Sequence, residues 1–121
     1  MKIRIKGNAL RYRLTRSDID LLEAKGIVHE QSNFGTALLQ YELRSTDVDQ
    51  LSASFINNCI TIRFPAAWIA EWLRTDKVGY EHRMELEGGG TLHLLVEKDF
   101  TCLDKVNEDQ SDHYPNPLIK K

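Results

Sequence analysis

The sequence predicts an α+β protein with about eight mostly antiparallel strands and two helices. Several short segments alternate apolar and polar residues with period two, which is typical of half-buried strands. Two other segments carry helix-capping residues and an apolar stripe. In addition, the pattern of apolar and polar residues in GNALRYRLT at 7–15 is repeated in NNCITIRFP at 57–65. These observations indicate two ββαββ halves related by a pseudo-two-fold axis, forming either a barrel or two packed sheets.

The first half begins with a hairpin. Residues 2–6 place Ile3 and Ile5 on one face and basic side chains on the other. Gly7-Asn8 provides the turn, because both residue types tolerate the positive φ of tight hairpins. The strands predicted in this half are 2–6, about 10–14, 27–32 and 36–43.

The second half repeats this plan. Leu51, Ala53 and Phe55 are predicted to face inward, and Asn57-Asn58 makes the turn. The strands predicted in this half are 51–55, 60–64, 78–86 and 91–98.

Each half also carries one predicted helix. Thr15 or Ser17 can cap the first helix, and Gly26 is placed to end it after residue 25. Pro65 is predicted at the first position of the second helix, where its missing N–H costs nothing, and this helix continues to Arg74.

The two halves can be aligned with short shifts. We therefore expect one domain at 1–98 built from two repeats, 2–43 and 51–98, followed by an acidic, Pro-containing tail at 99–121 that packs on the surface. The aligned residues are Asn8 with Asn58, Arg13 with Arg63, Ile19 with Ile69, Glu30 with Glu81, Gly35-Thr36 with Gly90-Thr91, Leu39 with Leu94, and Glu42 with Glu97.

The composition is that of an ordinary globular protein. Of 121 residues, 41% are hydrophobic and 28% charged, with a formal net charge of −2 that predicts no bulk attraction to nucleic acid or anionic lipid. No apolar run reaches the ~20 residues that span a bilayer, and the first residues lack a signal-peptide core. We expect a cytoplasmic protein with Cys59 and Cys102 as free thiols.

Positive charge is concentrated at the start of the chain. The first 17 residues carry six basic side chains and no acidic one. Clustered Lys and Arg on one strand face can bind an anion, or can simply prevent edge pairing and aggregation. No aromatic residue is interleaved to stack a base. The candidate anion-binding residues are Lys2, Arg4, Lys6, Arg11 and Arg13.

Negative charge follows near the other end. Six acids lie between Glu97 and Asp112, and this segment could cover and neutralise the basic face. It also suggests a weaker alternative, a small enzyme with a metal or thiol site built from Cys102, Asp104 and His113. The spacing of these residues matches no zinc template.

The last two predicted strands carry two histidines that are candidates for catalysis. His82 shares the inward face of its strand and could act as an acid–base group in the enzyme alternative, whereas His93 faces outward. No nucleophilic triad has motif context, so we predict no catalytic residue and no cofactor.

The ends of the chain carry the most specific motifs. The segments MKIRIKGNALRYRLT, VEKDFTCLD and DHYPNP resemble a family of small uncharacterised bacterial proteins over essentially the whole chain. The resemblance implies a cytosolic bacterial origin and a single compact domain, and carries over no activity.

The sequence therefore favours a non-catalytic binding or interaction module that contacts an anionic ligand or a protein, with no membrane partner. A homodimer is possible because eight strands leave free edges.

Overall fold

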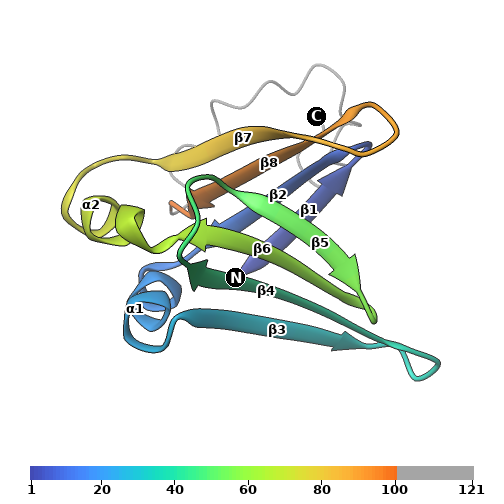
Figure 1. The fold of residues 1–121 in the computed structure, drawn as a ribbon. Helices are drawn as coiled ribbons and strands as arrows, with labels where there is room; N and C mark the ends of the chain where they lie inside the picture. The colour runs from blue at the N-terminus through green and yellow to red at the C-terminus, as the bar shows by residue number, and fades with distance from the viewer. Residues whose placement is uncertain (101–121) are drawn as a thin grey trace, which may run out of the picture.

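The computed structural model describes residues 1–100 and has an α+β architecture of eight strands and two α-helices (Figure 1). The elements in chain order are β1 (Lys2–Lys6), β2 (Ala9–Leu14), α1 (Arg16–Lys25), β3 (Ile27–Asn33), β4 (Leu38–Thr46), β5 (Ser52–Ile56), β6 (Cys59–Pro65), the 3₁₀ helix η1 (Ala66–Trp68), α2 (Ile69–Arg74), β7 (Gly79–Glu85) and β8 (Thr91–Lys98).

The strands form two four-stranded sheets, in the orders β1-β2-β8-β7 (sheet A) and β3-β4-β6-β5 (sheet B). Each sheet contains one hairpin from each half of the chain. The outer pairs are antiparallel, whereas the central pairs β2–β8 and β4–β6 are parallel. The two sheets are separate layers, so of the two predicted arrangements the structure has the two-sheet one (Figure 1).

The strand orders have the symmetry that the sequence suggested. Exchanging each strand for its counterpart four strands away converts β1-β2-β8-β7 into β5-β6-β4-β3, which is sheet B read from its other edge. The registers correct the alignment, however. Leu10 and Ile60 are equivalent residues of the two halves. Leu10 lies opposite Leu94, and Ile60 lies opposite Tyr41. The residue equivalent to Leu94 is therefore Tyr41 and not Leu39, as the alignment had it.

The same correction applies to two other aligned pairs. The registers make Arg44, not Glu42, the counterpart of Glu97, and His82, not Glu81, the counterpart of Glu30. Side-chain direction repeats every two residues, so the errors of two positions at Leu39 and Glu42 leave the pattern of their strand unchanged, whereas the error of one position at Glu30 exchanges the faces of the strand. The sequence alone therefore could not fix this alignment.

The core lies between the inner faces of the sheets and under the helices. Tyr12 crosses it, because its hydroxyl donates to the carbonyl oxygen of Ile60 in the other sheet at 3.2 Å. Near the helices the core is aromatic: the rings of Phe64 and Trp72 stack at 5.2 Å. The fully buried side chains include Tyr12, Leu14, Leu22, Leu43, Ile62, Phe64, Trp72, Leu94 and Val96.

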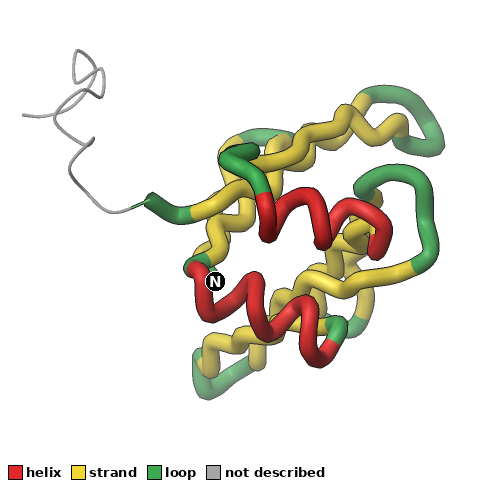
Figure 2. The backbone as a smooth tube through the Cα atoms, turned by 90° about the vertical axis from the view of Figure 1, so that its left-hand side faces the viewer, coloured by secondary structure: helices red, strands yellow, loops and turns green. Residues whose placement is uncertain are grey.

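Both helices cover one end of the sheet pair, and the four hairpin turns lie at the opposite end (Figures 1 and 2). Gly26 ends α1 at a φ of 79°, as predicted. Pro65 differs from its prediction: it is buried as the last residue of β6, and η1 precedes α2. Within residues 1–100, neither helix is both long and apolar enough to cross a membrane.

The start of α1 is fixed by a capping box. The Thr15 hydroxyl accepts from the Asp18 N–H at 3.2 Å, and the Asp18 carboxylate accepts from the Thr15 N–H at 2.9 Å. The α-amino group of Met1 lies 2.9 Å from the same carboxylate. Burial raises the pKa of Asp18, but these donors more than offset it, so the pKa lies below its ordinary value of 3.8.

Replacing Asp18 with Asn is expected to lower the free energy of unfolding at neutral pH by about 1 kcal/mol. Because the pKa of Asp18 is lowered, its contribution is present above pH 3.8 and is lost as the pH falls through the folded-state pKa. The difference between wild type and D18N in urea unfolding should therefore shrink in acid. Asp20→Asn, an exposed change in the same helix, is the control, and an equal loss there would contradict a specific cap.

Candidate anion-binding site

The β1–β2 hairpin gathers the predicted cations on the outer face of sheet A. Gly7 makes the turn with a φ of 54°, and the Asn8 side chain ties this turn to β8 by donating to the Thr91 carbonyl oxygen at 2.7 Å. The resulting register places basic residues directly opposite one another, Lys2 with Arg13 and Arg4 with Arg11. Like charges so placed destabilise a hairpin unless other groups offset them.

Two acids at the end of the chain's described part supply some of that compensation. Glu97 of β8 accepts from Arg13 Nε at 2.9 Å and lies 3.5 Å from Arg11 Nε. Asp99 lies 3.2 Å from the ammonium group of Lys2. Glu97 and Asp99 are the first two acids of the acidic run seen in the sequence; the other four, with the rest of the tail, lie outside the described residues.

The other two predicted cations, Arg4 and Lys6, form no ion pair within residues 1–100. They line, together with Arg11, a hollow of about 270 Å³ on the outer face of sheet A. The residues around the hollow are Arg4, Lys6, Ala9, Leu10, Arg11, His93 and Leu95, of which none is acidic.

His93 completes the rim of this hollow from β8. It lies on the outer face, as its alternation predicted, and its Nε2 is 2.8 Å from Glu81 Oε2. His93 could not be assigned to the site from the sequence, because the parallel pairing that sets β8 beside β2 joins segments about eighty residues apart. The one available signal was its outward position on the last strand.

The equivalent face of sheet B has a different chemistry. The registers make Ser52, Ser54 and Ile56 the counterparts of Lys2, Arg4 and Lys6. Arg63, the counterpart of Arg13, donates to the hydroxyls of Ser52 and Ser54 at 3.4 and 2.9 Å. The same strand geometry is therefore formed without a row of cations on its edge strand.

At the centre of the equivalent face of sheet B lies a carboxylate, that of Glu42. Glu42 is the residue of sheet B that corresponds to Leu95 of sheet A. It accepts from Arg44 at 2.7 Å and from Thr61 at 2.9 Å. Burial raises its pKa, but these donors more than offset the effect, so the pKa lies below its ordinary value. The ionised Glu42 is thus internally satisfied and would repel an added anion.

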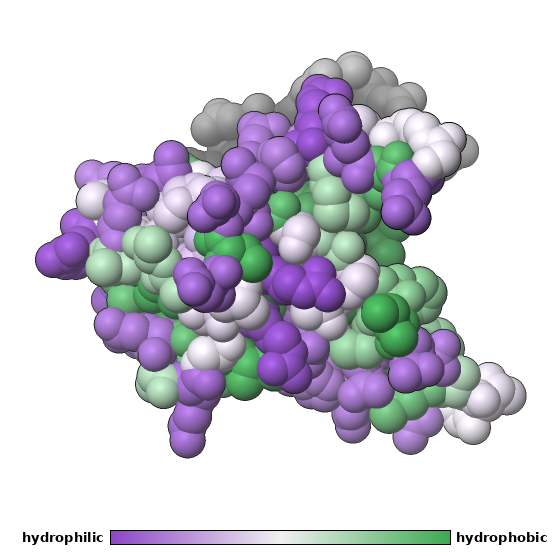
Figure 3. Space-filling view, viewed as in Figure 1, coloured by the Kyte–Doolittle hydropathy of each residue, from purple (hydrophilic) through white to green (hydrophobic). Residues whose placement is uncertain are grey.

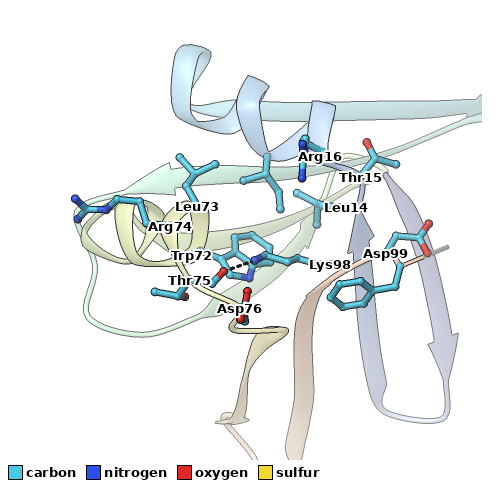
Figure 4. Close-up of a pocket in the computed structure, with 12 residues that line it drawn as sticks. Leu14, Thr15, Arg16, Trp72, Leu73, Arg74, Thr75, Asp76, Lys98 and Asp99 are labelled. Atoms are coloured by element: carbon cyan, nitrogen blue, oxygen red, sulfur yellow. Dashed lines mark hydrogen bonds between the residues drawn. The ribbon is translucent and has the colours of Figure 1, made fainter. Parts of the chain in front are cut away.

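A larger hollow of about 840 Å³ lies at the helical end, between α1, α2 and the end of β8 (Figure 4). Lys98 crosses it and donates to the Thr75 carbonyl oxygen at 2.9 Å. Its walls carry both signs of charge, since Arg16 and Lys98 are accompanied by Asp76 and Asp99. No pattern in the sequence indicated this hollow. Its mixed charge does not favour an anion as clearly as the charge of the hollow on sheet A does.

The residues of the enzyme alternative are only partly placed. Cys102, Asp104 and His113 lie outside the described residues. His82 lies half-buried on β7, and within residues 1–100 its side chain makes no hydrogen bond or ion pair. Cys59, the one cysteine in this part of the chain, is a half-buried free thiol. Residues 1–100 contain no group of three or more His, Cys, Asp or Glu side chains that could hold a metal ion.

Comparison with curated proteins and with solved structures gave no match. A family model, described as a family of unknown function (DUF7009), matches residues 1–118. This match spans both sheets and the hollow on sheet A. The chain therefore belongs to the family of unknown function DUF7009.

Proposed function

We propose that this protein is a non-catalytic binding module that holds an anionic group of its ligand in the hollow on the outer face of sheet A. The observation that carries the proposal is the convergence of Arg4, Lys6 and Arg11 around a hollow that no acidic side chain of residues 1–100 lines. Sheet B supports it, because its equivalent strands are built without these cations.

The chemistry of the rim suits a compact anion. Arginine presents a planar fork of donors that can bind a phosphate or carboxylate through two hydrogen bonds, and Lys6 adds a mobile point charge. The hollow, at about 270 Å³, is near the lower limit of typical small-ligand pockets, roughly 300 Å³. It fits one anionic group better than a polymer, and the residues of 1–100 that line it include no Phe, Tyr or Trp on which a base could stack.

Neutralising Arg4 and Lys6, the two predicted cations that form no ion pair in the described part of the chain, is the direct test. The double variant Arg4→Gln, Lys6→Gln should bind pyrophosphate at least about tenfold more weakly than wild type in a calorimetric titration at low salt, because two charge-assisted contacts are lost. Its thermal stability should be unchanged or slightly higher, because both side chains are exposed and belong to a crowded row of positive charge.

The matched control is Lys25→Gln, Lys77→Gln, which removes two exposed cations elsewhere and gives the same net charge. Equal weakening by both double variants would indicate a bulk charge effect, and unchanged binding by the first would exclude the hollow as the site. Arg11 and Arg13 are poorer test positions. Because both contact Glu97, reversing their charge would also disturb the sheet.

A further inference from the structure

The most exposed large apolar side chains of residues 1–100 gather at the end formed by the hairpin turns. Ile5, Phe34, Phe55 and Ile56 are 60%, 68%, 64% and 63% exposed, whereas the other three exposed large hydrophobic residues lie between 41% and 57%. Ile5 precedes the β1–β2 turn, Phe34 is in the β3–β4 turn, and Phe55 and Ile56 precede the β5–β6 turn. All these turns lie at the end away from the helices (Figure 1).

Two of these residues occupy core-facing positions that the sequence predicted to be buried. Ile5 pairs with the buried Leu10, and Phe55 pairs with the buried Ile60, so both lie on the inner faces of their sheets. Figure 3 shows a notch between the sheets at this end, with hydrophobic residues on both of its lips. Such a surface is typical of an interaction site.

Charge at this end is unevenly distributed among the turns. Arg4 and Lys6 flank Ile5 along β1 and belong to the hollow described above. The β3–β4 and β5–β6 turns, 34–37 and 57–58, contain no charged residue, and acids adjoin only the β7–β8 turn, at Glu85 and Glu87. Three of the four turns thus combine exposed apolar side chains with neutral or positive surroundings.

We propose that this end of the molecule docks on an anionic lipid bilayer. The apolar side chains near three turns enter the interfacial region, and the hollow on sheet A takes the phosphate of a lipid headgroup. The inference rests on the proposed function, whose anionic ligand it identifies as a headgroup. It depends on the local arrangement of charge rather than on the net charge of −2, which predicts no attraction to lipid.

A bilayer fits these features better than a second copy of the chain. The apolar groups are carried on separate turns, which can enter a soft interface independently, whereas a rigid partner would need a complementary contour. Two copies that met through their β1–β2 turns would also bring Arg4 and Lys6 of each toward like charges. Anionic headgroups instead attract these cations.

Sedimentation with vesicles tests the proposal on the full chain. Wild type should bind vesicles that contain phosphatidylserine and should not bind vesicles of phosphatidylcholine alone. The double variant Phe55→Ser, Ile56→Ser should bind the anionic vesicles at least about tenfold more weakly, because both apolar side chains then leave the interface. Leu21→Ser, Val78→Ser is the control, since it removes two exposed apolar residues away from the turns and should bind as wild type.

The outcomes separate this inference from the proposed function. If wild type binds pyrophosphate but not anionic vesicles, the bilayer is wrong while the anion site stands; if it binds neither, both are wrong. Equal vesicle binding by wild type and the Phe55/Ile56 variant would overturn docking by the turns. A dimer in gel filtration that this variant dissociates, without any vesicle binding by wild type, would assign the surface to a second copy instead.

Discussion

Replacing Trp72 with Ala is expected to lower the free energy of unfolding by about 3–5 kcal/mol, the largest effect of any single change considered. The side chain is fully buried, and its ring stacks on Phe64 at 5.2 Å and meets Tyr80 edge-on at 5.8 Å. Its indole N–H also donates to the Val78 carbonyl oxygen, at 3.4 Å. The substitution would therefore leave a cavity where α2 covers both sheets.

Urea unfolding followed by circular dichroism measures this effect without relying on the deleted fluorophore. Trp72→Phe should recover much of the lost stability, because an aromatic ring still fills most of the space. Trp68→Ala is the comparison, since Trp68 is only partly buried although it stacks on Tyr80 at 4.5 Å. A loss for Trp72→Ala no larger than that for Trp68→Ala would show that Trp72 is not the centre of this packing.

The elements of the fold could be predicted from the sequence because each has a local signal. Alternation identified the strands, and the turns at Gly7-Asn8 and Asn57-Asn58 have the positive φ values expected, 54° at Gly7 and 53° and 63° at the two asparagines. Gly26 ends α1 as predicted, and of the two predicted N-caps, Thr15 and Ser17, the structure uses Thr15. These features depend on residues close together in the chain, which a sequence displays directly.

The pairing of hairpins depends on distant residues and could not be predicted. Nothing in the alternation of β2 distinguishes β8 from β4 as its parallel neighbour. The period of two also predicted that Ile5 and Phe55 are buried, because a pattern gives the face of a strand but not the place where two sheets part. That opening became visible only with both sheets in place.

The candidate site was predicted in part for the same reason. Alternation placed five cations on one face of a hairpin, and the structure confirms that face. The alternation could not show which of these cations form ion pairs with acids and which do not. The residues that decide this, Glu97, Asp99 and His93, come from the far end of the domain. Which cations are available to a ligand is therefore a property of the tertiary structure.

Replacing Gly79 with Ala is the second change with a large expected effect, a loss of about 2–3 kcal/mol in the free energy of unfolding. A Cβ atom at this position would overlap the Val96 carbonyl oxygen and lie 2.7 Å from Cα and 2.8 Å from Cβ of Glu97. These are backbone or near-backbone atoms of the adjacent strand, so β7 and β8 would have to separate at the end that adjoins α2.

Gly35→Ala is the matched control, because Gly35 has a φ of 82° but open space around its Cα. It should cost only the strain of a left-handed alanine, about 1 kcal/mol. Urea midpoints of the two variants give the comparison, and equal losses would mean that β7 yields to the added methyl group without strain. Because the clash falls on Glu97, the Arg13 contact at 2.9 Å should also shift. Backbone amide resonances of β2 should therefore move in Gly79→Ala and stay in place in Gly35→Ala, which links the packing of β7 to the geometry of the cationic face.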